Sequence, residues 1–240
     1  MILLLSDVHT LFAVVNAQIE HAERRLGRPL AAAVVLGDMG LFEPELRRFF
    51  RREGQRFARP VFFLEGNHED FDLFEHLIGK YAEFFTYLPR GAPREIDGHR
   101  IVALGGSAYM DPAATPPKAV IAPEDIETCL RLPSSAGRVI LSHDCPAGIG
   151  VPNTPGFEGY GPPGFRGGER LVAHFKPKLW FFGHHHKWFD RTTGGTRYVG
   201  LPQSWEGYAL LDPHRTLRLV RHAVNVDRPF LPGLLKMLGF

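Results

Sequence analysis

The sequence predicts an α/β protein in which a parallel sheet is covered by helices. Three short apolar runs, at residues 2–6, 31–36 and 61–64, have the length and composition of buried strands. Between them, residues 11–26 carry apolar side chains at helical spacing, and residues 43–53 form a charged segment with the features of a second helix. The order strand, helix, strand, helix, strand is typical of a parallel sheet.

The middle of the chain changes character and predicts antiparallel strands. Residues 94–96 and 99–104 flank Asp97-Gly98, a two-residue sequence typical of a hairpin turn. A helix is expected over 124–131, and it leads into a strand over 138–141.

The last third of the chain combines a long irregular segment with further strands. Residues 146–168 are dense in glycine and proline, which predicts no regular structure there. A buried strand is expected over 178–182, and closing antiparallel strands over 197–199, 208–211 and 216–220. The chain therefore adds antiparallel strands to a parallel α/β core.

The composition is that of one soluble globular domain spanning residues 1–240. Hydrophobic residues make up 44% and charged residues 22% of the chain, which is ordinary for such proteins. The net charge of +2 is too even to indicate nucleic-acid or membrane binding through bulk charge. No segment is long and apolar enough to span a membrane, and no export signal is evident. The two cysteines exclude a disulfide framework, so we expect a cytoplasmic protein.

Polar residues that can bind metals follow five of the predicted strands. In open α/β sheets, ligands bind beyond the carboxyl ends of the strands, so residues far apart in sequence can meet there. Carboxylate, imidazole and amide ligands without thiolate suit manganese, iron, cobalt or zinc. The five segments are Asp7-Val8-His9, Gly37-Asp38, Gly66-Asn67-His68-Glu69, His143 and Gly183-His184-His185-His186.

Local spacing supports convergence of these side chains. In extended chain, residues i and i+2 point to the same side. Asp7 and His9 are therefore expected to reach one centre, as are His184 and His186, with His185 pointing away.

The ligand set also fits a pair of metal ions. A carboxylate has two oxygens, so Asp38 could join two ions about 3.5–4 Å apart, the spacing of two-metal phosphatases and nucleases. Two divalent ions with Asp7, Asp38 and a hydroxide leave a surplus of positive charge for a phosphate. A neutral ligand at Asn67 preserves that surplus.

The five motifs, in this order, resemble the calcineurin-like metallophosphoesterase superfamily. The resemblance covers Asp7 to His186, about three-quarters of the chain. It implies a four-layer fold, a double β-sheet sandwich flanked by helices. It also implies Asp7, His9, Asp38 and His186 as ligands of one metal, and Asp38, Asn67, His143 and His184 as ligands of the other. The cofactors would be two divalent ions, with manganese favoured and iron, cobalt, zinc or nickel as alternatives.

The resemblance also implies a mechanism. A hydroxide bridging the two metals attacks a phosphoester, and His68, which is not a ligand, stands near the leaving group with Glu69 or a neighbouring acid orienting it. RNA-lariat debranching members of the superfamily carry cysteine at the position of His9, so the histidine here argues that this protein does not belong to that branch. We expect a small phosphoester or nucleotide substrate, with phosphodiesters favoured. Phosphomonoesters, a non-catalytic metal-binding scaffold and a nucleic-acid-binding module remain the alternatives.

Two segments outside the motifs carry further predictions. The 146–168 segment joins two ligand-bearing strands, so Phe157, Tyr160, Phe165 and Arg166 are expected to form a lid or substrate platform, with Arg166 binding phosphate. A solvated rim is the alternative. The tail from Phe230 to Phe240 is rich in leucine. It is expected to pack on the parent domain, with a dimer surface as the alternative.

Overall fold

The computed structural model describes residues 1–214 and 216–226, and these contain two six-stranded sheets. The strands of the first sheet are β1 (Ile2–Leu5), β2 (Ala32–Leu36), β3 (Val61–Leu64), β4 (Thr86–Tyr87), β11 (Gly207–Leu211) and β12 (Leu217–Arg221). Their order is β12-β11-β1-β2-β3-β4. The four strands from β1 to β4 are parallel, and β11 and β12 extend the sheet in antiparallel fashion.

The second sheet also has a parallel centre, but it has an antiparallel strand at each of its two edges. Its strands are β5 (Pro93–Ile96), β6 (His99–Leu104), β7 (Val139–Ser142), β8 (Leu179–Phe182), β9 (Phe189–Thr193) and β10 (Thr196–Gly200). They run in the order β5-β6-β7-β8-β10-β9. The predicted hairpin is present, because β5 and β6 pair on either side of Asp97-Gly98.

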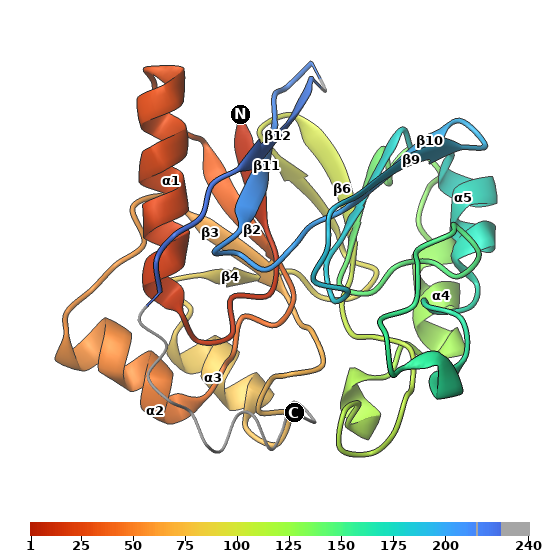
Figure 1. Cartoon of the computed structure of the whole chain (residues 1–240), viewed down its shortest axis with the longest axis horizontal. Coiled ribbons are helices and arrows are strands. Elements are labelled where there is room, and N and C mark those ends of the chain that lie inside the picture. Colours follow the sequence, from red (N-terminus) through yellow and green to blue (C-terminus); the bar gives the residue numbers. More distant parts are fainter. Residues whose placement is uncertain (215, 227–240) are drawn as a thin grey trace.

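The two sheets pack face to face, and helices cover both outer faces (Figure 1). Along β1, Ile2 and Leu4 lie in the core between the sheets, whereas Leu3 and Leu5 pack in the core beneath the helices. This alternation follows from the two-residue period of a strand. Burial on both faces explains why the strands are continuous apolar runs. The four-layer sandwich expected from the sequence is confirmed.

The helices fall into two groups, one on each outer face. The first sheet carries α1 (Phe12–Leu26), α2 (Glu43–Leu46) and α3 (Phe74–Lys80), and the second carries α4 (Pro123–Leu130) and α5 (Gly168–Phe175). The helix predicted over 43–53 is α-helical only at its start and continues as a π-helix, η1 (Arg47–Arg52). The wider turn lets the neighbouring side chains Phe49 and Phe50 both pack against Phe12.

Three local predictions differ from the structure. Strand β10 pairs antiparallel with β9 but parallel with β8. Strand β9 escaped prediction because its exposed edge sequence is largely polar. Within the irregular segment, a short 3-10 helix, η3 (Glu158–Tyr160), forms, and Gly168 already begins α5. Another 3-10 helix, η2 (Pro117–Ala119), lies earlier in the chain, between β6 and α4.

Two further predictions meet the limits of what the structure describes. Among residues 1–214 and 216–226, no helix is both long and apolar enough to cross a bilayer. The tail from Phe230 to Phe240, predicted to pack on the domain or to form a dimer surface, lies outside the described residues.

Candidate metal centre

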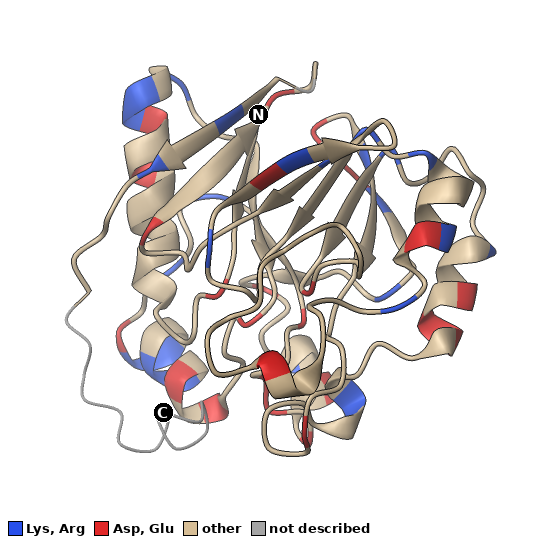
Figure 2. Ribbon diagram, turned by 45° about the vertical axis from the view of Figure 1, so that its right-hand side comes forward, with Lys and Arg blue, Asp and Glu red and all other residues tan. Residues whose placement is uncertain are grey.

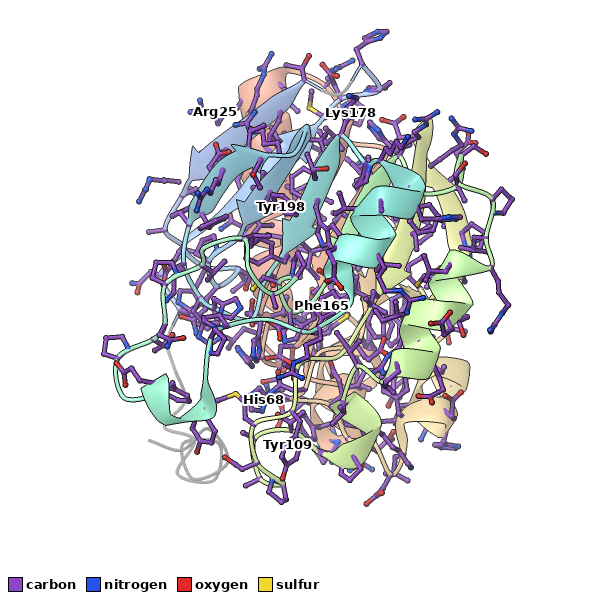
Figure 3. The ribbon with its side chains drawn as sticks, turned by 90° about the vertical axis from the view of Figure 1, so that its right-hand side faces the viewer. Arg25, His68, Tyr109, Phe165, Lys178 and Tyr198 are labelled. Carbon is purple, nitrogen blue, oxygen red and sulfur yellow. The ribbon has the colours of Figure 1, made fainter. Side chains whose placement is uncertain are left out.

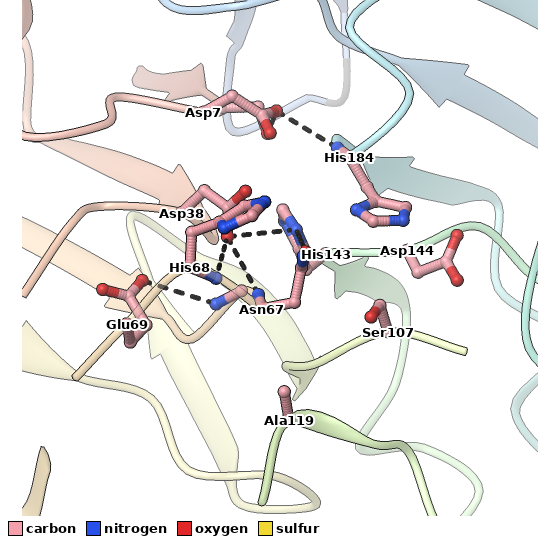
Figure 4. A network of polar contacts seen from close by, with 12 residues as sticks. Asp7, Asp38, Asn67, His68, Glu69, Ser107, Ala119, His143, Asp144 and His184 are labelled. Carbon is pink, nitrogen blue, oxygen red and sulfur yellow. Dashed lines mark hydrogen bonds and ion pairs between the residues drawn. The ribbon is translucent and has the colours of Figure 1, made fainter. Parts of the chain in front are cut away.

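The loops that follow β1, β2, β3, β7 and β8 meet where the two sheets adjoin (Figure 4). Backbone hydrogen bonds join neighbouring loops, for example from Asp7 N to the Gly37 carbonyl at 3.2 Å and from Gly183 N to the His143 carbonyl at 2.8 Å. One bond crosses between the sheets, because the His143 Nδ1 lies 2.8 Å from the Leu36 carbonyl. The convergence expected from the strand ends is therefore present in the structure.

Four of the predicted ligands form one compact group. Donor atoms of Asp7, His9, Asp38 and His186 all lie within 4.8 Å of one another. His186 Nε2 is 3.1 Å from Asp7 Oδ1, and His9 Nε2 is 3.9 Å from both Asp7 Oδ1 and Asp38 Oδ2. These are the residues that the resemblance assigns to one metal.

One atom of this group has no partner within the protein. His9 Nε2 is buried, and it makes no hydrogen bond with any of the described residues. Leaving a buried polar atom unsatisfied costs about 1–3 kcal/mol, so such atoms are rare and need an explanation. A metal ion between this nitrogen and the two carboxylates would satisfy it. The donor set of two carboxylates and two imidazoles therefore fits a divalent ion.

The second predicted ligand set lies directly beside the first. His143 Nε2 is 3.4 Å from Asp38 Oδ1 and 3.0 Å from Asn67 Oδ1. The His184 ring packs edge-on against the His143 ring, with centroids 4.9 Å apart. Asp38 stands between the two sets, with Oδ2 toward His9 and Oδ1 toward His143. It thus has the placement that a bridging carboxylate requires.

The backbone at these residues is left-handed rather than extended. Eight described non-glycine residues have positive φ, and five of them are Asp7, His9, Asp38, His184 and His186. The chain is therefore not extended at these residues, and the predicted i, i+2 geometry of an extended strand is wrong here. The strands end before these residues, and tight left-handed turns direct the side chains. Strained backbone of this kind costs about 1–3 kcal/mol per residue and concentrates at functional sites.

The two predicted ligands of the Gly183–His186 motif, His184 and His186, do not belong to the same cluster of ligands. His186 joins the Asp7 group, whereas His184 lies beside His143. This separation differs from the single centre expected from local spacing, and it agrees with the two sets implied by the resemblance. His185 points elsewhere, as expected, and its Nε2 is 2.9 Å from Asp144 Oδ1.

The electrostatics favour a charged Asp38 and a neutral His184 at this site. Burial opposes ionisation of Asp38, but His143, His68 and His9 nevertheless hold its pKa at about 2. Burial, assisted by the neighbouring His143 and His185, lowers the pKa of His184 to about 3. A neutral imidazole is the form that binds a metal. Asp38 and His184 therefore have the protonation states that metal binding needs. Despite burial, the Asp38 and Asp7 charges raise the pKa of His143, and Asp7 raises the pKa of His186, so a metal would displace protons from these two rings.

Hydrogen bonds hold two of the predicted ligands in a fixed orientation. The Leu36 carbonyl accepts from His143 Nδ1 at 2.8 Å, which directs Nε2 toward Asp38 and Asn67, where it could act as a ligand. The Ala114 carbonyl accepts from Asn67 Nδ2 at 2.7 Å, which leaves the amide oxygen facing His143. Backbone carbonyls thus determine which atom each ligand presents.

Glu69 has a different role from the one predicted. Instead of orienting His68, its carboxylate accepts the backbone N–H groups of Met39, Gly40 and Leu41 at 2.6–3.0 Å. Burial and the nearby Asp38 charge raise the pKa of Glu69 to about 8. Glu69 therefore ties the loop after β2 to the loop after β3, and so it positions Asp38.

His68 lies at the rim of the centre without a hydrogen-bonded partner for its ring. Its backbone N–H donates to Asp38 Oδ1 at 2.9 Å, and its ring is 5.7 Å from the His9 ring. Among the described residues, none hydrogen-bonds to the His68 imidazole. No acid orients this ring, contrary to the prediction.

Glycines allow the loops to approach this closely. A Cβ added at Gly66 would lie 1.9 Å from Asp38 Oδ1, and one at Gly183 would lie 1.6 Å from Ser6 Oγ. At Gly37, φ is +86° and a Cβ would meet the His143 ring at 2.2 Å. The glycines that precede Asp38, Asn67 and His184 therefore make room for side chains from the other loops.

A cavity of about 480 Å³ opens beside the centre. It extends from Asp38, Asn67 and the histidines to two surface segments, one around Tyr109 and one around Phe157 and Tyr160. The predicted platform residues Phe157 and Tyr160 line it. Phe165 is instead buried in the core beneath α4 and α5.

Arg166 does not lie in this cavity. The residue is exposed and is not among those that line the space. Because the preceding Phe165 turns into the core, the chain carries Arg166 away from the centre. The structure thus offers no phosphate contact for the residue predicted to bind the substrate.

Sequence reasoning missed the segment around Tyr109 that forms the other wall. Its organising residue is Asp111, whose Oδ1 accepts the N–H groups of Ala113 and Ala114 at 2.9 Å. The available signal was the Asp111-Pro112 pair, because aspartate followed by proline favours turn initiation.

Comparison with known proteins places the chain in a family. Residues 1–188 match the family model described as calcineurin-like phosphoesterase. The match covers well over half of the chain, so this protein belongs to the calcineurin-like phosphoesterase family, a family of phosphoester hydrolases. Among curated proteins, none matches the sequence significantly.

Solved structures support the fold at low sequence identity. One crystal structure superposes with a TM-score of 0.67 at 15% identity, covering 92% of this chain and 98% of its own. Phosphopantetheinyl hydrolase from Mycobacterium tuberculosis superposes with a TM-score of 0.55 at 16% identity, covering 97% and 98%. GAP50, described as the anchor in the inner membrane complex of Plasmodium, gives 0.56 at 10% identity, covering 99% and 93%.

Proposed function

We propose that this protein is a phosphodiesterase that uses two divalent metal ions, with manganese as the favoured metal. The observation that carries the proposal is the compact group of Asp7, His9, Asp38 and His186, of which Asp38 and His186 line the cavity. Asp38 also faces His143. A pair of bound divalent ions supplies Lewis acidity and a nucleophile derived from water near neutral pH.

The chain's own residues have distinct parts in the proposed reaction. The carboxylates and imidazoles hold the ions, while Asn67 adds a neutral ligand that leaves surplus positive charge for the phosphate. In the net reaction, water adds to phosphorus, the bond from phosphorus to the leaving oxygen breaks, and that oxygen takes a proton. His68 lines the cavity, and none of the described residues hydrogen-bonds to its ring, so it is placed to donate this proton.

The charges around the cavity favour a diester over a monoester. Within the described part of the chain, the residues that line the cavity include Asp111 and Asp144 but no lysine or arginine. A monoester carries up to two negative charges and a diester carries one. With only the two ions and a protonated His68 as cations in the proposed site, the diester meets less repulsion from these carboxylates.

A non-catalytic metal-binding scaffold is the second candidate. The resemblance in fold to GAP50, described as an anchor, keeps this alternative in view. The cavity and the non-ligand His68 that lines it favour the enzyme, because a metal-binding scaffold needs neither.

Hydrolysis of bis-p-nitrophenyl phosphate by manganese-loaded protein tests the proposal. We expect turnover that needs added metal and that exceeds turnover of p-nitrophenyl phosphate. A His68→Gln variant should keep its bound metal and lose about 10²-fold or more in rate. Bound metal without hydrolysis of either ester, whichever divalent ion is supplied, would instead support the scaffold.

A further inference from the structure

The cavity is larger than a phosphate group needs. Its volume of about 480 Å³ lies within the range of sites that hold small organic ligands. The part beyond the metal centre is formed by two segments, loop A (residues 108–115) and loop B (residues 153–164). This part would surround the organic group of an ester whose phosphate sits at the metals.

Exposed aromatic rings stand at the walls of this outer part. Tyr109 of loop A is 58% exposed and Tyr160 of loop B is 51% exposed, and Phe157 lies beside Tyr160 with ring centroids 5.9 Å apart. Only three large hydrophobic residues in the described chain are exposed to this degree, and two of them line the cavity. The third, Leu73, lies elsewhere. Figure 3 shows Tyr109 and His68 at the same end of the molecule.

The outer part carries no positive charge that could hold a polyphosphate. Its lining has no lysine or arginine among the described residues, and Asp111 contributes a carboxylate. In the view of Figure 2, basic residues lie scattered over the helices and strands rather than gathered on one face. A flat, uncharged group therefore suits this space better than a chain of phosphates.

A hydrogen-bonded connection joins the two loops to each other and to the metal centre. The Tyr160 hydroxyl of loop B donates to Asp111 Oδ2 of loop A at 3.0 Å. Asp111 Oδ1 accepts the Ala114 N–H at 2.9 Å, and the Ala114 carbonyl accepts from Asn67 Nδ2 at 2.7 Å. The same aspartate thus holds the aromatic wall and the turn that orients a predicted metal ligand.

We infer that loops A and B form the substrate-selecting pocket, and that it takes a singly charged phosphodiester bearing a flat, uncharged ring. Tyr109, Phe157 and Tyr160 are the specificity-determining residues, and Asp111 positions them. The inference rests on the proposed phosphoesterase function. The ring could be a phenyl group or a nucleobase, because both offer a face for stacking.

Binding of matched, singly charged analogues to manganese-loaded protein tests the inference. The monomethyl esters of phenylphosphonic and methylphosphonic acid differ only in the ring, and a thymidine ester of methylphosphonic acid supplies a nucleobase instead. Calorimetry should give at least about tenfold tighter binding of the phenyl than of the methyl compound, as expected for aromatic stacking. Equal affinities of all three compounds would overturn the inference. Relative affinities of the phenyl and thymidine compounds identify the source of the ring.

Three substitutions and one control connect this preference to the loops. Tyr109→Ala and Phe157→Ala should each reduce the preference by about fivefold or more, while affinity for the methyl compound stays within about twofold. Tyr160→Phe keeps the ring but removes the bond to Asp111, so it should reduce the preference and speed hydrogen exchange in loop A. Leu73→Ala, at an apolar residue outside the cavity that is 43% exposed, should change neither.

The outcomes separate this inference from the proposed function. A preference that survives in Tyr109→Ala, Phe157→Ala and Tyr160→Phe alike would overturn the assignment to these loops, even if all variants hydrolyse bis-p-nitrophenyl phosphate. A loop-dependent preference for the ring in a protein that hydrolyses no phosphoester would retain the pocket and reject the phosphodiesterase.

Discussion

The metal centre and the substrate loops are built in opposite ways, although they line one cavity. Asp7, Asp38 and His143 are at most 1% exposed and come directly after strands. Tyr109 and Tyr160 are more than half exposed and lie on segments with little regular structure. The difference indicates that the chemistry is fixed by the sheets, whereas selection of the substrate belongs to the loops.

The two regions also differ in how their backbones are restrained. The loop after β2 is held by three N–H donations to the Glu69 carboxylate. Loop B is linked to loop A by a single described side-chain bond, from Tyr160 to Asp111. We therefore expect substitutions in the first region to act on metal binding and stability, and those in the second to act on selectivity.

The largest effect is expected from Asp38→Asn. Asp38 is the carboxylate shared by both predicted ligand sets, so the variant should lose its bound metal. Its activity should fall by far more than 100-fold, because mutating a residue that only hydrogen-bonds to a metal ligand already lowers metal affinity or activity by about 10–100-fold. Elemental analysis and diesterase kinetics measure this. Despite burial, the neighbouring histidines hold the pKa of Asp38 below its ordinary 3.8, so its charge stabilises the metal-free fold and the variant should also be less stable. Asp72→Asn, at a fully exposed aspartate, is the control, and equal metal content in both variants would contradict the prediction.

A smaller but still severe effect is expected from Gly66→Ala. The added Cβ would overlap Asp38 Oδ1, at 1.9 Å, so the carboxylate must move. A displacement of this size at a catalytic centre lowers activity by about 100-fold. Gly159→Ala is the matched change in loop B, where a Cβ meets nothing within 4 Å. It should retain diesterase activity close to that of the unmodified protein, and similar losses in the two variants would remove the distinction between the regions.

Glu69→Ala should lower stability more than it changes the chemistry. The substitution leaves the N–H groups of Met39, Gly40 and Leu41 without their acceptor, so we expect a loss of about 3 kcal/mol or more in the free energy of unfolding. Urea denaturation of the metal-free protein measures it. Glu95→Ala, at an exposed position in β5, should change this free energy by less than about 0.5 kcal/mol. A Glu69→Ala variant as stable as the control would show that these bonds do not restrain the loop.

The smallest predicted effect concerns a surface ion pair away from both regions. The hydrogen bond from Arg59 holds the pKa of Glu23 below its ordinary 4.5. The pair therefore stabilises the fold above about pH 4.5, and this contribution disappears as the pH falls through the lowered pKa. Both side chains are partly exposed, so a double-mutant cycle with Glu23→Gln and Arg59→Gln should give under about 1 kcal/mol at pH 7. The coupling should become smaller as the pH falls below about 4.5, and a larger coupling in acid would contradict this sign.

The sequence predicted the residues of the centre better than their geometry. Asp7, Asp38 and His143 were found because five strand-like runs end in polar residues that can bind metals, and such strand ends converge at one edge of the sheet. The left-handed backbone at Asp7 and Asp38 was not found, because φ there depends on loops from other strands. The role of Glu69 was hidden as well, since its partners are backbone N–H groups that every residue type carries.

Prediction was weakest in the substrate loops, for a related reason. Composition correctly indicated an irregular segment containing Phe157 and Tyr160, but it could not give the direction of each side chain. Arg166 was predicted to bind phosphate, and it is carried outward because Phe165 packs in the core. Asp111 was missed because its importance depends on contacts with loop B and Asn67, which only the folded chain brings together.

Anomalous X-ray diffraction from crystals grown with manganese tests the central claim most directly. The account predicts two manganese peaks about 3.5–4 Å apart, with Asp38 between them, His9 and His186 at one peak, and His143 and His184 at the other. A single peak, or peaks away from Asp38 in a protein that hydrolyses phosphodiesters, would contradict it.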